Sequence, residues 1–392
     1  MSVVDDLVAL VRIDSQSPGA LEHACAAWVG GRLQRAGITV RRYDTPSGRP
    51  NLVAAVAGSG QGPRLVLLAH MDTVPAGEGW SEDPLGGAVR DGAVWGRGAA
   101  DMKAGLAVGI AVLESLAADP PPGEVVLCAT ADEEGPDMSG IHALVAQGVV
   151  GGADQVLALE PTGLRLRLAQ VGLRWLEIDV RGRMAHAGRA HVDGIDANYL
   201  AALIAAELKR RVPRLAGEHE QLGPPRITCS GLRGGVAVNI VPASCTLTLD
   251  ARVVPPLVPK DAEHLARRVA GEVCAAFPGS SFEVRRLGAA RPPVVADESC
   301  PLVRGLRRAY RGEVGRPLEQ GGEDGHEAYT DASMVAALTG SRSCTVWGPG
   351  HPSQAHAADE HVAIAELAVA QRVLIRLARE LDIGQVSVSA SC

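Results

Sequence analysis

The sequence predicts an α/β protein, in which a discontinuous domain with a mostly parallel sheet flanked by helices receives an inserted α+β domain. Three observations support this prediction. Apolar runs alternate with helical periodicity in the first part of the chain, the middle shows strand-like alternation, and the first pattern resumes from about residue 290. Buried parallel strands are continuously apolar, whereas half-buried strands alternate between apolar and polar residues.

The first part of the chain reads as alternating strands and helices. Residues 65–69, 125–129 and 156–159 are short apolar runs entered from loops rich in Gly or Pro, which is typical of buried parallel strands. Strand and helix alternation of this kind favours a parallel sheet with helices on both faces. The helices predicted for this domain are residues 3–13, 21–36, 102–117 and 362–382.

The middle of the chain has a different pattern. Residues 174–181 alternate between apolar and polar, as in a half-buried strand. Helices are predicted at 195–209 and 261–277, and further strands at 227–232, 237–240 and 246–253. We therefore expect residues 1–173 and 289–392 to form one metal-binding domain and residues 174–288 to form the inserted one.

Composition excludes several classes of protein. The chain has 392 residues, enough for about two domains, and 46% are hydrophobic, which supports a sizeable core. The net charge of -7 argues against binding nucleic acid, which needs a strongly basic face. No apolar run is long enough to span a membrane, and no basic and apolar leader begins the chain. The 8 cysteines form no CxxC pair. We expect free thiols in a reducing cytoplasm.

Acidic and histidine residues follow the predicted strands where these end. His70 and Asp72 follow the first strand, Asp132-Glu133-Glu134 the second and Glu160 the third. Asp101 ends a glycine-rich turn before a helix, and a histidine-rich segment from His351 to His361 lies near the C-terminus. Ligands of open α/β sheets bind at the carboxyl ends of strands. Carboxylates gathered there would repel one another without a cation, and a mixed set of His and carboxylate ligands suits zinc, with cobalt or manganese as alternatives.

Each of these features also has a simpler interpretation. His70 and Asp72 could be a surface pair, Asp132-Glu133-Glu134 a solvated turn, and Asp101 only a helix cap. Glu160 could be an ordinary residue at a strand end, and the histidines near His356 a surface run. The joint arrangement is what favours a metal site.

Several motifs together carry a family resemblance. They are His70 to Pro75, Trp95 to Gly105, Asp132 to Gly135, Glu160-Pro161-Thr162, Ala185 to Gly188, Gly234 to Pro242, Asp250-Ala251-Arg252, and Gly348-Pro349-Gly350 leading to His356. In these motifs the chain resembles the di-zinc amidohydrolases that include acetylornithine deacetylase, succinyl-diaminopimelate desuccinylase, aminoacylase and glutamate carboxypeptidase. The resemblance covers nearly the whole chain.

The resemblance implies a two-metal site. Asp101 would bridge two divalent metal ions, with His70 and Glu160 completing one site and Glu134 and His356 the other. Glu133 would be the general base that deprotonates a metal-bridging water. Asp72 would hold the far ring nitrogen of His70.

The resemblance also implies roles for the inserted domain, which looks like a lid and dimerisation domain. His186 would stabilise the oxyanion in the partner subunit of a homodimer, and Asn239 would assist. Arg252 would bind a substrate carboxylate through its guanidinium fork, and Gly350 is counted with the substrate-binding residues. Two of these residues have an alternative interpretation: Arg252 could form a surface salt bridge, and His186 could have a structural role.

The predicted activity is hydrolysis of the amide bond of an N-acyl amino acid. An exopeptidase, dipeptidase or carboxypeptidase on the same scaffold is the first alternative, and a catalytically inactive binding homologue is the second. The expected partner is a small N-acyl amino acid or short peptide. The polar stretch from Gly321 to Asp331 is either a loop with substrate determinants or a solvated loop, and the sequence leaves this open.

Overall fold

The structure, a computed structural model, describes residues 1–60, 62–321 and 328–381. Residues 322–327 of the polar stretch thus lie outside the described residues. The described residues divide into two compact units: the first lies within 1–169, 295–321 and 330–381, and the second comprises 170–294 together with 328 and 329. Each unit has its own hydrophobic core.

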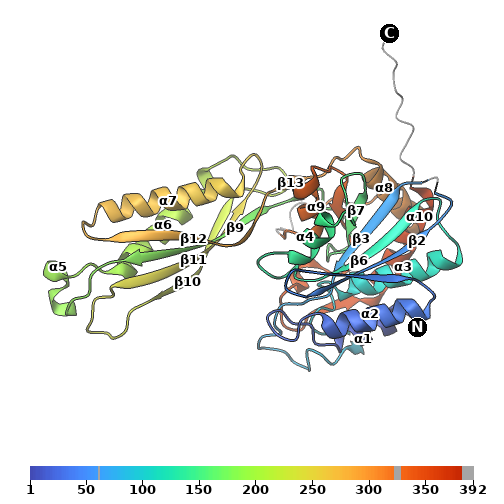
Figure 1. Ribbon diagram of the computed structural model, residues 1–392, viewed down its shortest axis with the longest axis horizontal. Helices are drawn as coiled ribbons and strands as arrows, with labels where there is room; N and C mark the ends of the chain where they lie inside the picture. The colour runs from blue at the N-terminus through green and yellow to red at the C-terminus, as the bar shows by residue number, and fades with distance from the viewer. Residues whose placement is uncertain (61, 322–327, 382–392) are drawn as a thin grey trace, which may run out of the picture. The chain divides into compact units, whose positions relative to one another are not determined.

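The first unit contains a six-stranded sheet with the order β1-β2-β6-β3-β7-β14. Strands β6, β3, β7 and β14 are mutually parallel, while β2 runs antiparallel to both of its neighbours. The predicted α/β class with a mostly parallel sheet is confirmed (Figure 1). The strands are β1 (Val40–Asp44), β2 (Pro50–Ala57), β3 (Arg64–His70), β6 (Glu124–Thr130), β7 (Gln155–Ala158) and β14 (Cys344–Val346).

Helices cover this sheet and bury its apolar strands. Helix α3 packs on β3 and β6, and α1 and α10 pack in turn on α3. Helices α4 and α9 contact each other and the outer strands, α4 on β1 and β2, α9 on β7 and β14 (Figure 1). The helices are α1 (Val3–Val11), α2 (His23–Arg35), α3 (Lys103–Ala118), α4 (Ser139–Ala146), α8 (Pro301–Val314), α9 (Asp331–Thr339) and α10 (Ile364–Glu380).

Local sequence explains where these helices begin and end. Ser2 and Asp5 form a capping box at the start of α1, with reciprocal bonds between side chain and backbone. Gly315 and Gly340 end α8 and α9 in the left-handed conformation, which glycine adopts at no steric cost. A small three-stranded sheet completes the unit, formed by β4 (Ala88–Arg90), β5 (Ala93–Trp95) and β15 (His361–Ala363).

The second unit is a four-stranded antiparallel sheet with the order β10-β11-β9-β12. Helices α6 (Ala197–Arg211) and α7 (Pro259–Ala275) contact each other and pack on this sheet. The strands alternate in burial, as β11 shows, because only one face meets the helices. They are β9 (Gly172–Arg181), β10 (Arg226–Gly234), β11 (Ser244–Val253) and β12 (Ser281–Arg291), and the short helix α5 (Ala190–Asp193) precedes α6.

The strand predicted at residues 237–240 is wrong. This segment is a loop in which Val238 is fully exposed, and Ile240 makes only an isolated bridge to His186. Gly235 adopts a φ of 92°, which breaks the extended chain after β10. The fourth strand of this sheet is β12 instead.

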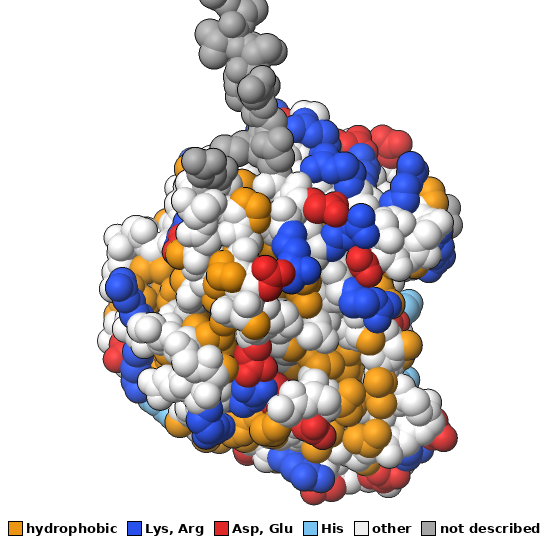
Figure 2. Space-filling view, turned by 90° about the vertical axis from the view of Figure 1, so that its right-hand side faces the viewer, with side chains coloured by type: hydrophobic (Ala, Val, Ile, Leu, Met, Phe, Trp, Pro, Cys, Tyr) orange, Lys and Arg blue, Asp and Glu red, His pale blue; other side chains and the backbone are white. Residues whose placement is uncertain are grey.

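The surface of the protein carries mixed charge. On the face shown in Figure 2, basic and acidic side chains lie interspersed rather than in separate fields. Such mixing allows ion pairs at the surface, and Arg376 pairs with both Glu313 and Glu380. Among the residues that the structure describes, no helix has both the length and the apolar character needed to cross a membrane.

Candidate metal centre

Three neighbouring strands bring the acidic and histidine residues together. In the order β6-β3-β7, each strand ends at the same edge of the parallel sheet. His70 is the last residue of β3, Glu133 and Glu134 follow β6, and Glu160 follows β7. Parallel pairing therefore makes neighbours of groups that are far apart in the sequence.

Asp101 lies between two histidines that face different oxygens of its carboxylate. The Nε2 atom of His70 is 3.3 Å from Oδ1 of Asp101, and Nε2 of His356 is 3.5 Å from Oδ2. Glu160 lies 3.8 Å from the His70 nitrogen, and Glu134 lies 3.0 Å from that of His356. We call His70, Asp101 and Glu160 the inner group, and Asp101, Glu134 and His356 the outer group. Within each group the potential ligand atoms lie within 4.8 Å of one another.

A glycine allows Asp101 to reach this position. Asp101 precedes α3, and Gly105 lies in the first turn of that helix. A Cβ atom at Gly105 would lie 2.1 Å from the backbone oxygen of Leu159. Only glycine therefore permits the N-terminal turn of α3 to approach the end of β7, where Glu160 follows.

Burial gives the carboxyls of the site unusual pKa values. It raises the pKa of Glu133 and that of Glu160 well above the usual range, although His70 opposes the shift. Burial lowers the pKa of His70, but the hydrogen bond with Asp101 and the charges of Glu160 and Glu133 outweigh it and raise the pKa overall. For His356, the hydrogen bond with Glu134 raises the pKa to about 9.

Several carboxyls share a space in which they cannot all be ionised at ordinary cost. The donor set of imidazole nitrogens and carboxylate oxygens, gathered within 4.8 Å in each group, fits divalent metal ions such as zinc. A cation in each group would supply the charge that burial demands.

Asp72 makes contacts that differ from the prediction. The Nδ1 atom of His70 lies 2.8 Å from the backbone carbonyl of Asp72, whereas the Asp72 carboxylate is 3.9 Å away. Since a carbonyl can only accept, Nδ1 carries a hydrogen. In the protonated ring Nε2 donates to the Asp101 carboxylate, and in a neutral ring with the hydrogen on Nδ1 it would present its lone pair to the site instead. The Asp72 carboxylate instead accepts the backbone N–H groups of Glu133 and Glu134, at 3.3 and 3.2 Å.

Arg49 is a residue of this region that sequence reasoning missed. Its guanidinium pairs with the buried carboxylates of Glu22 and Asp132 and lies 3.5 Å from that of Asp72. Burial raises the pKa of Asp72 to about 7, and the charges of His70 and, to a smaller extent, Arg49 oppose this shift. An arginine 23 residues from Asp72 gives no periodic signal that links the two.

The remaining predicted residues lie elsewhere, three of them in the second unit. His186 is exposed, and its Nδ1 accepts the backbone N–H of Gly188 at 3.1 Å. Asn239 is also exposed. Arg252 donates to both carboxylate oxygens of Asp250, at 2.7 and 2.8 Å, which is the salt bridge considered as the alternative. In the first unit, Gly350 donates its N–H to Glu366 at 2.7 Å.

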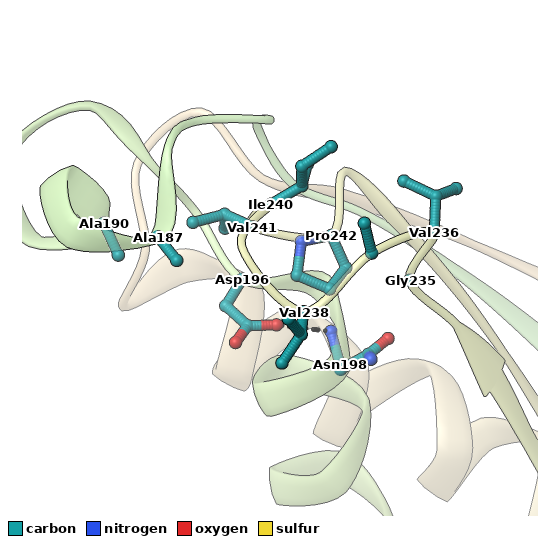
Figure 3. A pocket seen from close by; sticks show the side chains of 11 residues that line it. Ala187, Ala190, Asp196, Asn198, Gly235, Val236, Val238, Ile240, Val241 and Pro242 are labelled. Carbon is teal, nitrogen blue, oxygen red and sulfur yellow. Dashed lines mark hydrogen bonds between the residues drawn. The ribbon is translucent and has the colours of Figure 1, made fainter.

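A cavity of about 520 Å³ opens in the second unit, on the loop that carries Asn239 (Figure 3). Its lining includes Ala187, Asp196, Asn198 and residues 235–238 and 240–242. Asp196 caps α6 by accepting the N–H groups of Asn198 and Tyr199, while Val236 on the rim is 78% exposed. None of the inner or outer group lines this cavity.

The chain is similar in sequence to several known proteins. The chain is 32% identical over 331 residues to a putative [LysW]-lysine/[LysW]-ornithine hydrolase of Pyrobaculum aerophilum, covering 84% of this chain and 85% of the relative. It is 30% identical over 374 residues to a succinyl-diaminopimelate desuccinylase of Xanthomonas campestris pv. campestris, covering 92% and 93%. An acetylornithine deacetylase of Myxococcus xanthus is 29% identical over 358 residues and 88% of each chain.

Solved structures share the fold. A tripeptidase from Staphylococcus aureus matches with a TM-score of 0.79 and 20% identity, over 96% of this chain and 97% of the other. A Bacillus subtilis protein described as a dinuclear metal-binding peptidase from the M20 family matches with a TM-score of 0.69 and 16% identity, over 96% of each chain. Residues 66–380 match peptidase family M20/M25/M40 as a whole. The chain belongs to this family and is a hydrolase, as the motifs predicted.

Proposed function

We propose that the chain hydrolyses the amide bond of an N-acyl amino acid at a site that holds two divalent metal ions. The observation that carries the proposal is the position of Asp101, whose two carboxylate oxygens face His70 and His356 separately. A carboxylate placed in this way can serve two ions at once. Zinc is the proposed metal because each group mixes imidazole and carboxylate donors. Metal ions bound there would polarise the substrate carbonyl and lower the pKa of a water.

Glu133 is the proposed general base. Its backbone is fixed by Asp72, and its carboxyl is buried but belongs to neither ligand group. Burial raises the pKa of its carboxyl. A carboxylate at this position would take a proton from the attacking water and return it to the leaving amine nitrogen. Glu134, the next residue, contacts His356 instead.

The substrate class rests on the relatives and on the charged groups of the second unit. Relatives that the chain matches over most of its length are named as a desuccinylase and a deacetylase, which both remove acyl groups. Arg252 is the proposed contact for the amino-acid carboxylate, which would share the guanidinium with Asp250. Asn239 and Gly350 remain proposed as further substrate contacts.

His186 is the proposed oxyanion donor, acting in the partner subunit of a homodimer. Its exposed ring supports this role. Because Nδ1 accepts the N–H of Gly188, the neutral ring carries its hydrogen on Nε2, which makes Nε2 a donor. An N–H donor is what a developing oxyanion needs.

A hydrolysis screen tests the function. Zinc-loaded protein is expected to cleave N-acetyl and N-succinyl amino acids faster than dipeptides, and Glu133→Gln should lower kcat by about 10²–10⁴-fold without changing zinc content. The amide keeps the shape of the side chain but cannot accept the proton. Full turnover by Glu133→Gln would contradict the assigned base, and a preference for dipeptides would replace the deacylase with a peptidase.

Mixed subunits test the role of His186. If the site is shared across a dimer, mixing inactive His186→Ala and Glu133→Gln subunits should restore part of the activity, because one of the two sites in a mixed dimer regains both residues. Mixtures as inactive as either parent would argue against a shared site.

A further inference from the structure

Glu360 has a fully buried carboxylate on which four donors converge. Its Oε2 accepts from the N–H of Gly98 at 2.9 Å and from Nη1 of Arg97 at 2.6 Å. Its Oε1 accepts from the N–H groups of Ala100 and Asp101, at 2.8 and 2.9 Å. We propose that Glu360 is a positioning residue for the metal centre, which holds the loop of residues 96–101 so that Asp101 faces both histidines.

The chemistry of the four contacts requires a carboxylate. Only an ionised carboxylate offers acceptor sites for four donors and presents no hydrogen to repel them. Hydrogen bonds to a charged acceptor are also stronger than neutral ones. Arg97 balances the charge, because its guanidinium is buried beside Glu360 and donates in addition to the carbonyl of Ala76 at 3.2 Å. The ring of Trp80 lies 5.1 Å from that guanidinium.

The backbone of Glu360 ties the same loop to the segment that carries His356. The Glu360 carbonyl accepts the N–H of Gly96 at 2.9 Å, and β15 then pairs with β5, with His361 opposite Trp95. His356 lies four residues before Glu360 in the chain. One residue therefore joins the two segments that supply Asp101 and His356, two of the three ligands of the outer group.

The inner group depends on Glu360 less. His70 and Glu160 are held by the adjacent strands β3 and β7, and only Asp101 of that group belongs to the loop. Disturbing Glu360 should therefore weaken the outer group more than the inner one. The inference rests on the proposed metal site, and zinc binding to the unaltered protein tests that site separately.

Calorimetric titration of metal-stripped, full-length protein with zinc tests the proposal. Glu360→Gln places an amide hydrogen against loop N–H groups. One zinc equivalent, which we assign to the outer group, should lose about 10–100-fold in affinity, as expected when a group that orients a ligand is lost. The other equivalent should change by a smaller factor. Asp6→Asn is the matched control, because Asp6 is equally buried and pairs with Arg32 in the same unit, without contact to any ligand.

Melting temperatures separate positioning from stability alone. Both variants should melt earlier than the unaltered protein, but only Glu360→Gln should lose zinc affinity. Glu360→Asp, which keeps the charge but withdraws it by one methylene, should show the same selective loss if Glu360→Gln does not fold. Unchanged zinc affinity in a folded Glu360 variant would overturn the proposal. Failure of the unaltered protein to bind zinc would instead overturn the metal site.

Discussion

The inner and outer groups share Asp101 but place their histidines in different surroundings. The side chain of His70 is 1% exposed and that of His356 is 55% exposed. The inner ligands His70 and Glu160 are set by a buried parallel sheet, while His356 lies on a loop at a φ of 62°. The two groups thus use similar ligands, but His70 lies in a region of low dielectric whereas His356 is in contact with solvent. We infer that the inner group is part of the folded core, whereas the position of His356 in the outer group is less strongly fixed by packing.

The largest effect is expected when the residue common to both groups is changed. Asp101→Asn replaces one carboxylate oxygen with an amide nitrogen and leaves the other oxygen neutral, so each group loses a charged ligand atom. Both zinc equivalents and turnover should therefore fall by more than about 100-fold, beyond the loss of a merely orienting partner. Zinc content and kcat/KM measure this. Glu160→Gln and Glu134→Gln are the matched controls, and each should weaken one equivalent. If Asp101→Asn lost only one equivalent, Asp101 would not bridge.

The two histidines should differ in their contribution to stability. His70→Ala leaves buried carboxylates without their partner, so the metal-free protein should lose about 3–5 kcal/mol in its free energy of unfolding. His356→Ala removes a half-exposed partner and should cost about 0–1 kcal/mol. Urea denaturation in a chelator gives both values. Equal losses would show that burial does not distinguish the groups.

The smallest effect is expected in the pH dependence of the metal-free protein. Glu133 and Glu160 keep protons in the folded state after the unfolded chain has lost them, because burial raises their pKa. His70 and His356, with raised pKa values, stabilise the fold at low pH and stop doing so as pH rises. All four groups predict that stability falls as pH rises above about 5.

His356 contributes to this trend over its own range of pH. Its pKa is raised from 6.5 to about 9, so its contribution is complete below 6.5 and is lost as pH rises through about 9. In His356→Ala, urea midpoints of metal-free protein should therefore fall less steeply between these values than in the unaltered protein. His23→Ala, at an exposed position of α2, is the control. Identical slopes in the two variants would assign the trend to the other three groups, Glu133, Glu160 and His70.

The fold was largely predictable because parallel strands and amphipathic helices leave regular patterns. The predicted strand at 125–129 corresponds to β6, and the predicted helix at 102–117 to α3. The wrong strand prediction at residues 237–240 has a physical cause. The backbone turns at Gly235, and Val236 and Val238 beyond it are exposed. Alternation in the sequence does not show whether a neighbouring strand is there to pair with such residues.

Parts of the site were less predictable because they depend on distant contacts. The ends of the predicted strands were sufficient to place His70, Glu134 and Glu160 at one edge of the sheet. The partners of Arg49 and Glu360 arise from packing between segments far apart in the chain, which periodicity does not encode. The Asp72 contact differed for a related reason, since the backbone of Glu133 and Glu134 competes with His70 for its carboxylate.

The strand order β6-β3-β7-β14 also bears on how the protein comes into being. Neighbouring strands in this sheet are separated by long stretches of chain, which include a second folded unit between β7 and β14. Such topologies fold slowly, because loop closure precedes the contacts that reward it. His356 is synthesised last among the candidate ligands, and Glu360, which we propose holds the loop of Asp101, is synthesised after it. Both groups are therefore expected to form only late in biosynthesis, when nearly the whole chain has been made.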